Sequence, residues 1–142
     1  MLKGEIINGQ LLKILGETGH ADWLAVSDSG LPVPLDKERV DLAFTPGKPR
    51  ILDVLKTVTE AMAIEKAYIA EEIRQASPNY HQKLLALLKK TGCEIAYLPH
   101  VEFKAMTRDA NMRACIRSGE LTSYSSVILQ AGVNYGGEQA DC

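Results

Sequence analysis

The arrangement that most constrains the fold is the alternation of short apolar runs with longer amphipathic patterns. Runs of strand length lie at 23–27, 39–44, 66–72, 94–98, 113–118 and 126–133. Patterns of helical period precede or separate these runs, at 10–18, 49–62, 78–91 and 101–107. Strands separated by helices favour a mixed or mostly parallel sheet with helices on both faces. We therefore predict an α/β fold with three layers.

Residues with capping preferences mark the ends of the predicted helices. Asn8 precedes the first helix, where its side chain can accept a hydrogen bond from a free amide, and Gly19 is expected to end that helix. Ser77 followed by Pro78 is typical of a helix start, because the hydroxyl can cap and proline is tolerated at the first helical position. Gly92 is expected to end the same helix.

Chain length and charge favour one globular domain. The 142 residues can bury a core without disulfides or metal ions. We expect a single domain over residues 1–135, followed by a flexible tail over 136–142. The formal net charge is -2 and no block of like charge occurs, which argues against nucleic acid and anionic membranes as partners.

Several classes of protein lack their sequence signals here. The cysteines Cys93, Cys115 and Cys142 are widely spaced and odd in number, which argues against a disulfide framework or a zinc site and suits a reducing compartment. We recognise no signal peptide and no run of about 18 apolar residues. Glycine-rich nucleotide loops and the patterns of zinc and serine hydrolases are also absent. A cytoplasmic protein is expected.

Polar side chains gather at the ends of the predicted elements. They are His20, Asp28, His100, Lys104, Glu120 and Tyr124. His20 and Asp28 flank the strand at 23–27, and we expect a helix end and a strand end to meet at one edge of the sheet as an acid/base pair. Each residue also has a structural interpretation. His20 can bind the last carbonyls of its helix, Asp28 can accept from amides of its turn, and Glu120 can be a turn carboxylate.

Six separated blocks of sequence resemble one enzyme family in order and spacing. The blocks are LGETGHADWLAVSDSGLPVP, RVDLAFTPGKP, AEEI, YLPHVEFK, IRSGELT and ILQAGV. Together they are similar to the D-ribose pyranase and fucose mutarotase family over about residues 3–133. The turn from Asp28 to Pro34 matches the D-x-G-L-P-x-P form of the ribose branch. Where the family usually has P-Y-A-N, this chain has Ser123, Tyr124, Ser125 and Ser126.

The resemblance implies a cofactor-free and metal-free isomerase that interconverts the pyranose and furanose forms of D-ribose. It implies that His20 is the proton donor and that Asp28, His100 and the stretch from Tyr124 to Ser126 bind the sugar, with Lys104 supplying further hydrogen-bond donors. It also implies self-association into a ring-like homo-oligomer, a decamer, with each pocket completed by an adjacent subunit.

Two other classes of function are compatible with the residues. The substituted segment from Ser123 to Ser126 keeps open a non-catalytic sugar-binding or regulatory subunit of a sugar transport system. A purely structural oligomer would leave His20, Asp28 and His100 as unrelated turn and cap residues. Catalysed exchange between sugar ring forms would distinguish the isomerase from both alternatives.

Overall fold

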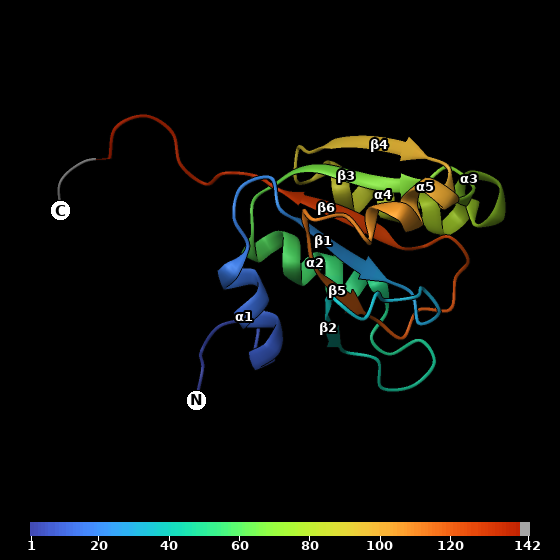
Figure 1. Ribbon diagram of the computed structural model, residues 1–142, viewed down its shortest axis with the longest axis horizontal. Helices are drawn as coiled ribbons and strands as arrows, with labels where there is room; N and C mark the ends of the chain where they lie inside the picture. The colour runs from blue at the N-terminus through green and yellow to red at the C-terminus, as the bar shows by residue number, and fades with distance from the viewer. Residues whose placement is uncertain (140–142) are drawn as a thin grey trace.

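The computed structural model describes residues 1–139 and contains a mixed six-stranded sheet with helices on both faces (Figure 1). The strands are β1 Trp23–Ser27, β2 Glu38–Asp41, β3 Ile64–Ala70, β4 Glu94–Leu98, β5 Met112–Arg117 and β6 Val127–Ala131. The helices are α1 Gly9–Glu17, α2 Ile51–Ala61, α3 Ile73–Ala76, α4 Pro78–Lys89 and α5 His100–Met106. The sheet order is β2-β5-β1-β6-β3-β4.

Strand direction distinguishes two opposite edges of the sheet. Strands β1 to β5 all run parallel, whereas β6 is inserted between β1 and β3 and runs antiparallel to both. In Figure 1 the arrows of β1, β3 and β4 point to the right and that of β6 points to the left. The carboxyl ends of the five parallel strands and the amino end of β6 therefore share one edge, here called the carboxyl edge. The opposite edge is called the amino edge.

The larger core lies between one face of the sheet and helices α1, α2 and α4. Alternate residues of each strand point into it, as expected for a pleated strand of period two. The buried side chains include Leu11, Ile14, Leu24, Val26, Ile51, Val54, Leu55, Val58, Ile69, Leu84, Leu88, Ile116, Val127 and Leu129. Full burial of a leucine or isoleucine is worth about 1.5–3 kcal/mol, so this face accounts for most of the hydrophobic stabilisation.

A smaller core lies on the other face, under α5 and the loop at 31–33. Its buried members are Ala25, Leu31, Phe103, Met112, Cys115 and Ile128. Trp23 and Tyr68 pack against this cluster and are partly exposed. Because α5 is short, the amino edge of this face carries polar and aromatic side chains that solvent can reach.

The predicted α/β fold and its helices on both faces are confirmed, and several local signals act as expected. Asn8 caps α1 by accepting a hydrogen bond from the Leu11 amide at 2.8 Å, and Pro78 is the first residue of α4. Ser77 does not cap α4, because its hydroxyl donates to the Ser123 carbonyl at 3.0 Å. Gly19 is not the left-handed residue after α1; Ala21 has that conformation, with φ 68°.

Two stretches differ from the sequence-based expectation. The strand expected at 39–44 ends at Asp41, and Phe44 is 86% exposed although its spacing indicated an inward side chain. Val40 alone supplies the buried position of β2. Beyond the strand, Leu42 is partly buried against the larger core, whereas Phe44 lies on the surface. The second is α3, a single turn after β3 that the residue pattern did not indicate.

The segments outside the sheet include both ends of the described chain. Residues 133–139 follow β6 as an exposed stretch that leads away from the sheet in Figure 1. Residues 140–142 of the expected tail, including Cys142, lie outside the described residues. No helix among the residues described is both long and apolar enough to cross a membrane.

Candidate functional site

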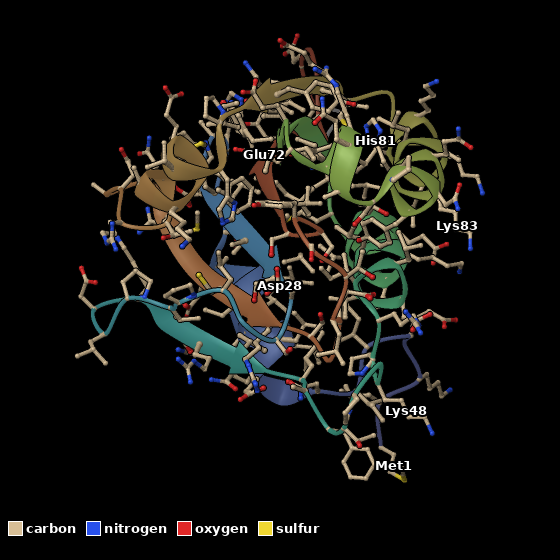
Figure 2. All side chains as sticks on the ribbon, turned by 90° about the vertical axis from the view of Figure 1, so that its right-hand side faces the viewer. Met1, Asp28, Lys48, Glu72, His81 and Lys83 are labelled. Carbon is tan, nitrogen blue, oxygen red and sulfur yellow. The ribbon has the colours of Figure 1, made fainter. Side chains whose placement is uncertain are left out.

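A polar pocket opens at the carboxyl edge, beside the middle of the sheet. Its cavity volume is about 310 Å³, and its walls are formed by Asp28, Gly30, Leu31, Pro32, His100, Lys104, Ser123 and Tyr124. Figure 2 views the molecule from this edge and shows Asp28 near the centre, with Glu72 on the side of β3. Ligands of parallel α/β sheets bind at the carboxyl ends of the strands, so this position is where a substrate is expected.

Asp28 follows β1 and is fixed in place by its own turn. One carboxylate oxygen accepts a hydrogen bond from the Gly30 amide at 2.8 Å, and the other accepts from the Ser126 hydroxyl at 2.9 Å. The Ser126 hydroxyl in turn accepts from the Asp28 amide at 3.0 Å. These two residues meet because β6 runs antiparallel to β1, so the start of β6 lies beside the end of β1. The expected turn role of Asp28 and its place in the pocket are therefore both present.

His100 is the first residue of α5 and lies against two aromatic rings. Its imidazole stacks on Phe103 with centroids 6.0 Å apart and meets Tyr124 edge-on at 5.0 Å. The backbone amide of His100 donates to both carboxylate oxygens of Glu72 at 3.0 Å, which anchors the start of α5 to the end of β3. Nδ1 of His100 is buried without a hydrogen-bond partner, which leaves Nε2 as the nitrogen that a ligand can reach.

The charge state of His100 follows from its surroundings. Burial lowers the pKa of His100 below its ordinary value of 6.5, and the neighbouring Lys104 ammonium lowers it further, against smaller opposing effects of Glu72 and Asp28. The imidazole is therefore neutral at neutral pH. Through Nε2 a neutral ring either donates or accepts, depending on its tautomer, which suits recognition of hydroxyl groups.

Replacing Lys104 with methionine is expected to raise the pKa of His100 relative to the wild-type protein. The reason is that the substitution removes the lysine charge, whereas burial, the larger cause, remains. Titration of the His100 ring by NMR measures this shift, and Lys37→Met serves as the control because Lys37 bonds to the Asp109 carbonyl and does not line the pocket. An unchanged His100 pKa in Lys104→Met would contradict the assignment.

The loop that carries Tyr124 is held in an unusual conformation. Tyr124 has φ 56°, in the left-handed region that non-glycine residues rarely adopt and that is often found at functional sites. The neighbouring residues are tied to α4, where the Tyr80 hydroxyl donates to the Ser125 carbonyl at 3.2 Å. Burial raises the pKa of Tyr80, so its hydroxyl stays protonated and remains a donor.

Glu120, which the sequence analysis placed among the polar candidates, has a structural environment. Its side chain is 1% exposed and accepts from the Arg50 guanidinium at 3.2 Å, the Ile51 amide at 3.4 Å and the Thr122 hydroxyl at 2.7 Å. A carboxylate at the first turn of α2 also interacts favourably with the helix dipole. Glu120 therefore joins α2 to the loop after β5, and it does not line the pocket.

His20 lies at the amino edge and does not meet Asp28 within one chain. The five residues of β1 separate them, which corresponds to about 16 Å along the strand. The expectation that the two residues share one edge is therefore wrong for a single chain, because α1 precedes β1 and ends at the amino edge. His20 also does not cap α1; its Nε2 lies 2.9 Å from Oε2 of Glu65, and its side chain is 54% exposed.

The structure thus brings together five of the six residues predicted to form the site and separates the sixth. Asp28, His100, Lys104, Tyr124 and Ser126 lie at the carboxyl edge, and His20 does not. Glu72 was not among the candidate residues, and the structure gives it a supporting role, because its carboxylate anchors the His100 amide. Its position directly after the β3 run was the available signal. Tyr80 and Glu65 had no such signal.

Within residues 1–139, no group of three or more His, Cys, Asp or Glu side chains is placed to hold a metal ion. The polar groups of the pocket are instead one carboxylate, one neutral imidazole, one ammonium and several hydroxyls. Such a set can bind the hydroxyls of a small polar molecule and exchange protons with it.

Comparison with known proteins gives matches over nearly the whole chain. The model of the RbsD / FucU transport protein family matches residues 1–134. The D-ribose pyranase of Pseudothermotoga lettingae is 44% identical over 141 residues, covering 99% of each chain. The D-ribose pyranase of Lactobacillus gasseri is 41% identical over 137 residues, covering 95% of this chain and 100% of that protein.

A solved structure agrees with the fold. Bacillus subtilis RbsD complexed with D-ribose superimposes with a TM-score of 0.87 at 42% sequence identity, covering 95% of this chain and 100% of that chain. Agreement of sequence, fold and length leads to one conclusion, which is that this chain belongs to the RbsD / FucU family.

Proposed function

We propose that this protein is a D-ribose pyranase, an isomerase that interconverts the pyranose and furanose forms of D-ribose. The observation that carries the proposal is the polar pocket at the carboxyl edge, in a chain 44% identical to a D-ribose pyranase and 42% identical to a protein solved with D-ribose. A cytoplasmic location, where a sugar is used after entry, is part of the proposal.

The composition of the pocket suits a pentose. Asp28 accepts hydrogen bonds from sugar hydroxyls, Lys104 donates, and His100 does either in its neutral form. The Tyr124 ring offers an apolar surface for the carbon–hydrogen face of the sugar. Ser126 acts through Asp28, because its hydroxyl is already bonded to that carboxylate.

The reaction consists of two proton-coupled steps on the hemiacetal. In ring opening, the bond between C1 and the ring oxygen O5 breaks, O5 gains a proton, and the C1 hydroxyl loses one to become an aldehyde. In ring closure, the O4 hydroxyl attacks C1 and loses its proton, and the aldehyde oxygen gains one. A positioned acid and base supply these protons, and a histidine serves as either near neutral pH.

The proton donor in this proposal is His20, supplied by an adjacent subunit. His20 lies at the opposite edge from the pocket of its own chain and is half exposed, so another molecule can reach it. A contact in which the amino edge of one subunit meets the carboxyl edge of the next is heterologous, and such contacts form a ring when the rotation between subunits closes. We propose a ring-like homo-oligomer, a decamer, in which each pocket receives His20 from a neighbour.

Saturation-transfer NMR on equilibrated D-ribose tests the proposed function. We expect the protein to accelerate magnetisation transfer between the pyranose and furanose signals, because acid/base catalysis of ring opening connects the two. L-fucose and D-allose under the same conditions are the comparison sugars, and we expect less acceleration with them. Binding of ribose without any acceleration of its exchange would contradict the proposal.

That contrary result would favour the second candidate, a sugar-binding or regulatory subunit of a transport system. One observation favours this candidate. Ser126 stands where the family usually has asparagine, and its hydroxyl is committed to Asp28. The second donor of an amide is therefore missing at this point of the pocket.

A further inference from the structure

At the amino edge, a series of hydrogen bonds connects His20 through Glu65 and Gln130 to the aromatic residues Trp23 and Tyr68. Nε2 of His20 lies 2.9 Å from Oε2 of Glu65, and the other oxygen of Glu65 accepts from the Gln130 amide nitrogen. The Gln130 carbonyl oxygen accepts from Trp23 Nε1 at 3.0 Å and from the Tyr68 hydroxyl at 3.0 Å. These residues come from β1, β3 and β6, so the sheet itself positions them.

The direction of each hydrogen bond in this chain is determined by Trp23. An indole nitrogen can only donate, so the atom of Gln130 that faces it must be the amide oxygen. The amide nitrogen of Gln130 then points to Glu65, which is an acceptor. The rings of Trp23 and Tyr68 also pack edge-on, with centroids 5.8 Å apart. The two hydrogen-bond donors to Gln130 are therefore held by packing against each other.

The carboxylate of Glu65 fixes which nitrogen of His20 carries the proton. The hydrogen bond from Gln130, followed by that from His20, lowers the pKa of Glu65, so the group is ionised at neutral pH and only accepts. The neutral imidazole therefore holds its proton on Nε2, so its Nδ1 accepts a proton, and Nδ1 donates when the ring is protonated. A carboxylate that orients a histidine in this way sets the nitrogen that is used in proton transfer.

We propose that Glu65 and Gln130 are positioning residues for catalysis, holding His20 so that Nδ1 is the nitrogen that exchanges protons with the sugar. This inference rests on the proposed function. His20 and Glu65 are partly exposed, and an isolated surface pair of this kind orders its side chains weakly. The connection through Gln130 to Trp23 and Tyr68 is what makes this pair different from a surface ion pair.

The variant Glu65→Gln tests the inference, with Glu94→Gln as its matched control. Glu94 is a carboxylate on neighbouring strand β4, where it pairs with Lys66 at 3.4 Å and does not touch His20. We expect Glu65→Gln to lower kcat for ribose exchange about tenfold or more and to change KM less than about twofold, because Glu65 contacts His20 and none of the residues that line the sugar pocket. The control is expected to keep both constants.

A spectroscopic measurement separates positioning from a merely structural role. The nitrogen-15 shifts of neutral His20 report its tautomer, and we expect the wild-type protein to show protonated Nε2 and unprotonated Nδ1. Glu65→Gln is expected to show a mixture of both tautomers. A second variant, Gln130→Met, keeps the carboxylate and removes its donor, and we expect it to lower kcat less than Glu65→Gln does.

The possible results distinguish this inference from the proposed function. Wild-type kcat or an unchanged His20 tautomer in a folded Glu65→Gln protein would overturn the positioning role and leave the pyranase proposal standing. A raised KM at constant kcat would overturn it too, because that result assigns Glu65 to binding. If His20→Ala exchanges ribose normally, the catalytic role of His20 and the positioning inference fall together.

Discussion

Replacement of His20 with alanine is expected to slow catalysed ribose exchange by about 10² to 10⁴-fold, the usual contribution of a positioned acid or base. The fold is expected to remain because His20 is exposed, and ribose binding is expected to remain because the residues that line the pocket are unchanged. Saturation-transfer NMR measures the exchange rate, and circular dichroism and ribose titration check the fold and the pocket. Exchange at the wild-type rate would remove His20 from the mechanism.

A mixture of two inactive variants tests whether His20 acts on a neighbouring subunit. His20→Ala keeps an intact pocket, and His100→Ala keeps an intact His20. When the two are unfolded together and refolded in equal amounts, we expect about one quarter of wild-type activity. Each site in a closed ring needs a subunit with an intact His100 beside a neighbour with an intact His20, and in random assembly each condition is met half of the time. Separately refolded variants mixed afterwards are the control. No recovery on joint refolding would contradict a shared site.

Substitution of Gly119 with alanine is expected to destabilise the protein by about 3 kcal/mol, since overpacking against a rigid backbone is among the costlier core changes. A Cβ at this position would lie 2.5 Å from the Lys48 carbonyl oxygen, 2.7 Å from the Lys48 nitrogen and 2.7 Å from the Thr45 carbonyl oxygen. Gly119 is also hydrogen-bonded to this loop through its amide and its carbonyl. The loop cannot retreat without losing those bonds.

The same substitution at Gly16 is the matched control and has the opposite expected sign. Gly16 lies inside α1, where a Cβ would meet nothing within 4 Å, so alanine is expected to stabilise by about 0.5–1 kcal/mol. Urea unfolding of the three proteins measures both effects, and the melting temperature of Gly119→Ala is expected to fall by about 10 °C. Equal stability of Gly119→Ala and wild type would show that the loop at 45–48 adapts.

The sequence predicted those features of the fold that depend on local patterns. Apolar periodicity located β1, β3, β4 and β6, and the residues Asn8 and Pro78 marked helix starts where the structure has them. The end of β2 was misjudged, because Phe44 continues the alternation beyond Asp41, where the pairing of β2 with β5 ends, and its side chain is exposed. Alternation shows which residues can face a core, whereas pairing decides whether a core is there.

The candidate site was only partly predictable for a related reason. Asp28 and His100 follow strands, so residue order alone indicated the carboxyl edge for both. Nothing in the local sequence gives the direction of β6, and that direction determines that Ser126 meets Asp28 and that Gln130 meets Glu65. His20 was expected beside Asp28 because both flank β1, although the two ends of one strand necessarily lie at opposite edges.

The reversed direction of β6 makes this one strand a physical link between the two halves of the chemistry. Ser126, the residue before β6, restrains the Asp28 carboxylate in the sugar pocket. Gln130, near the end of β6, restrains the Glu65 carboxylate that bonds to His20. A register slip of a single residue in β6 would release both at once and turn its buried side chains to the wrong face. Mutations along this strand therefore need separate assays of sugar affinity and proton transfer, since a single loss of activity reports on either end.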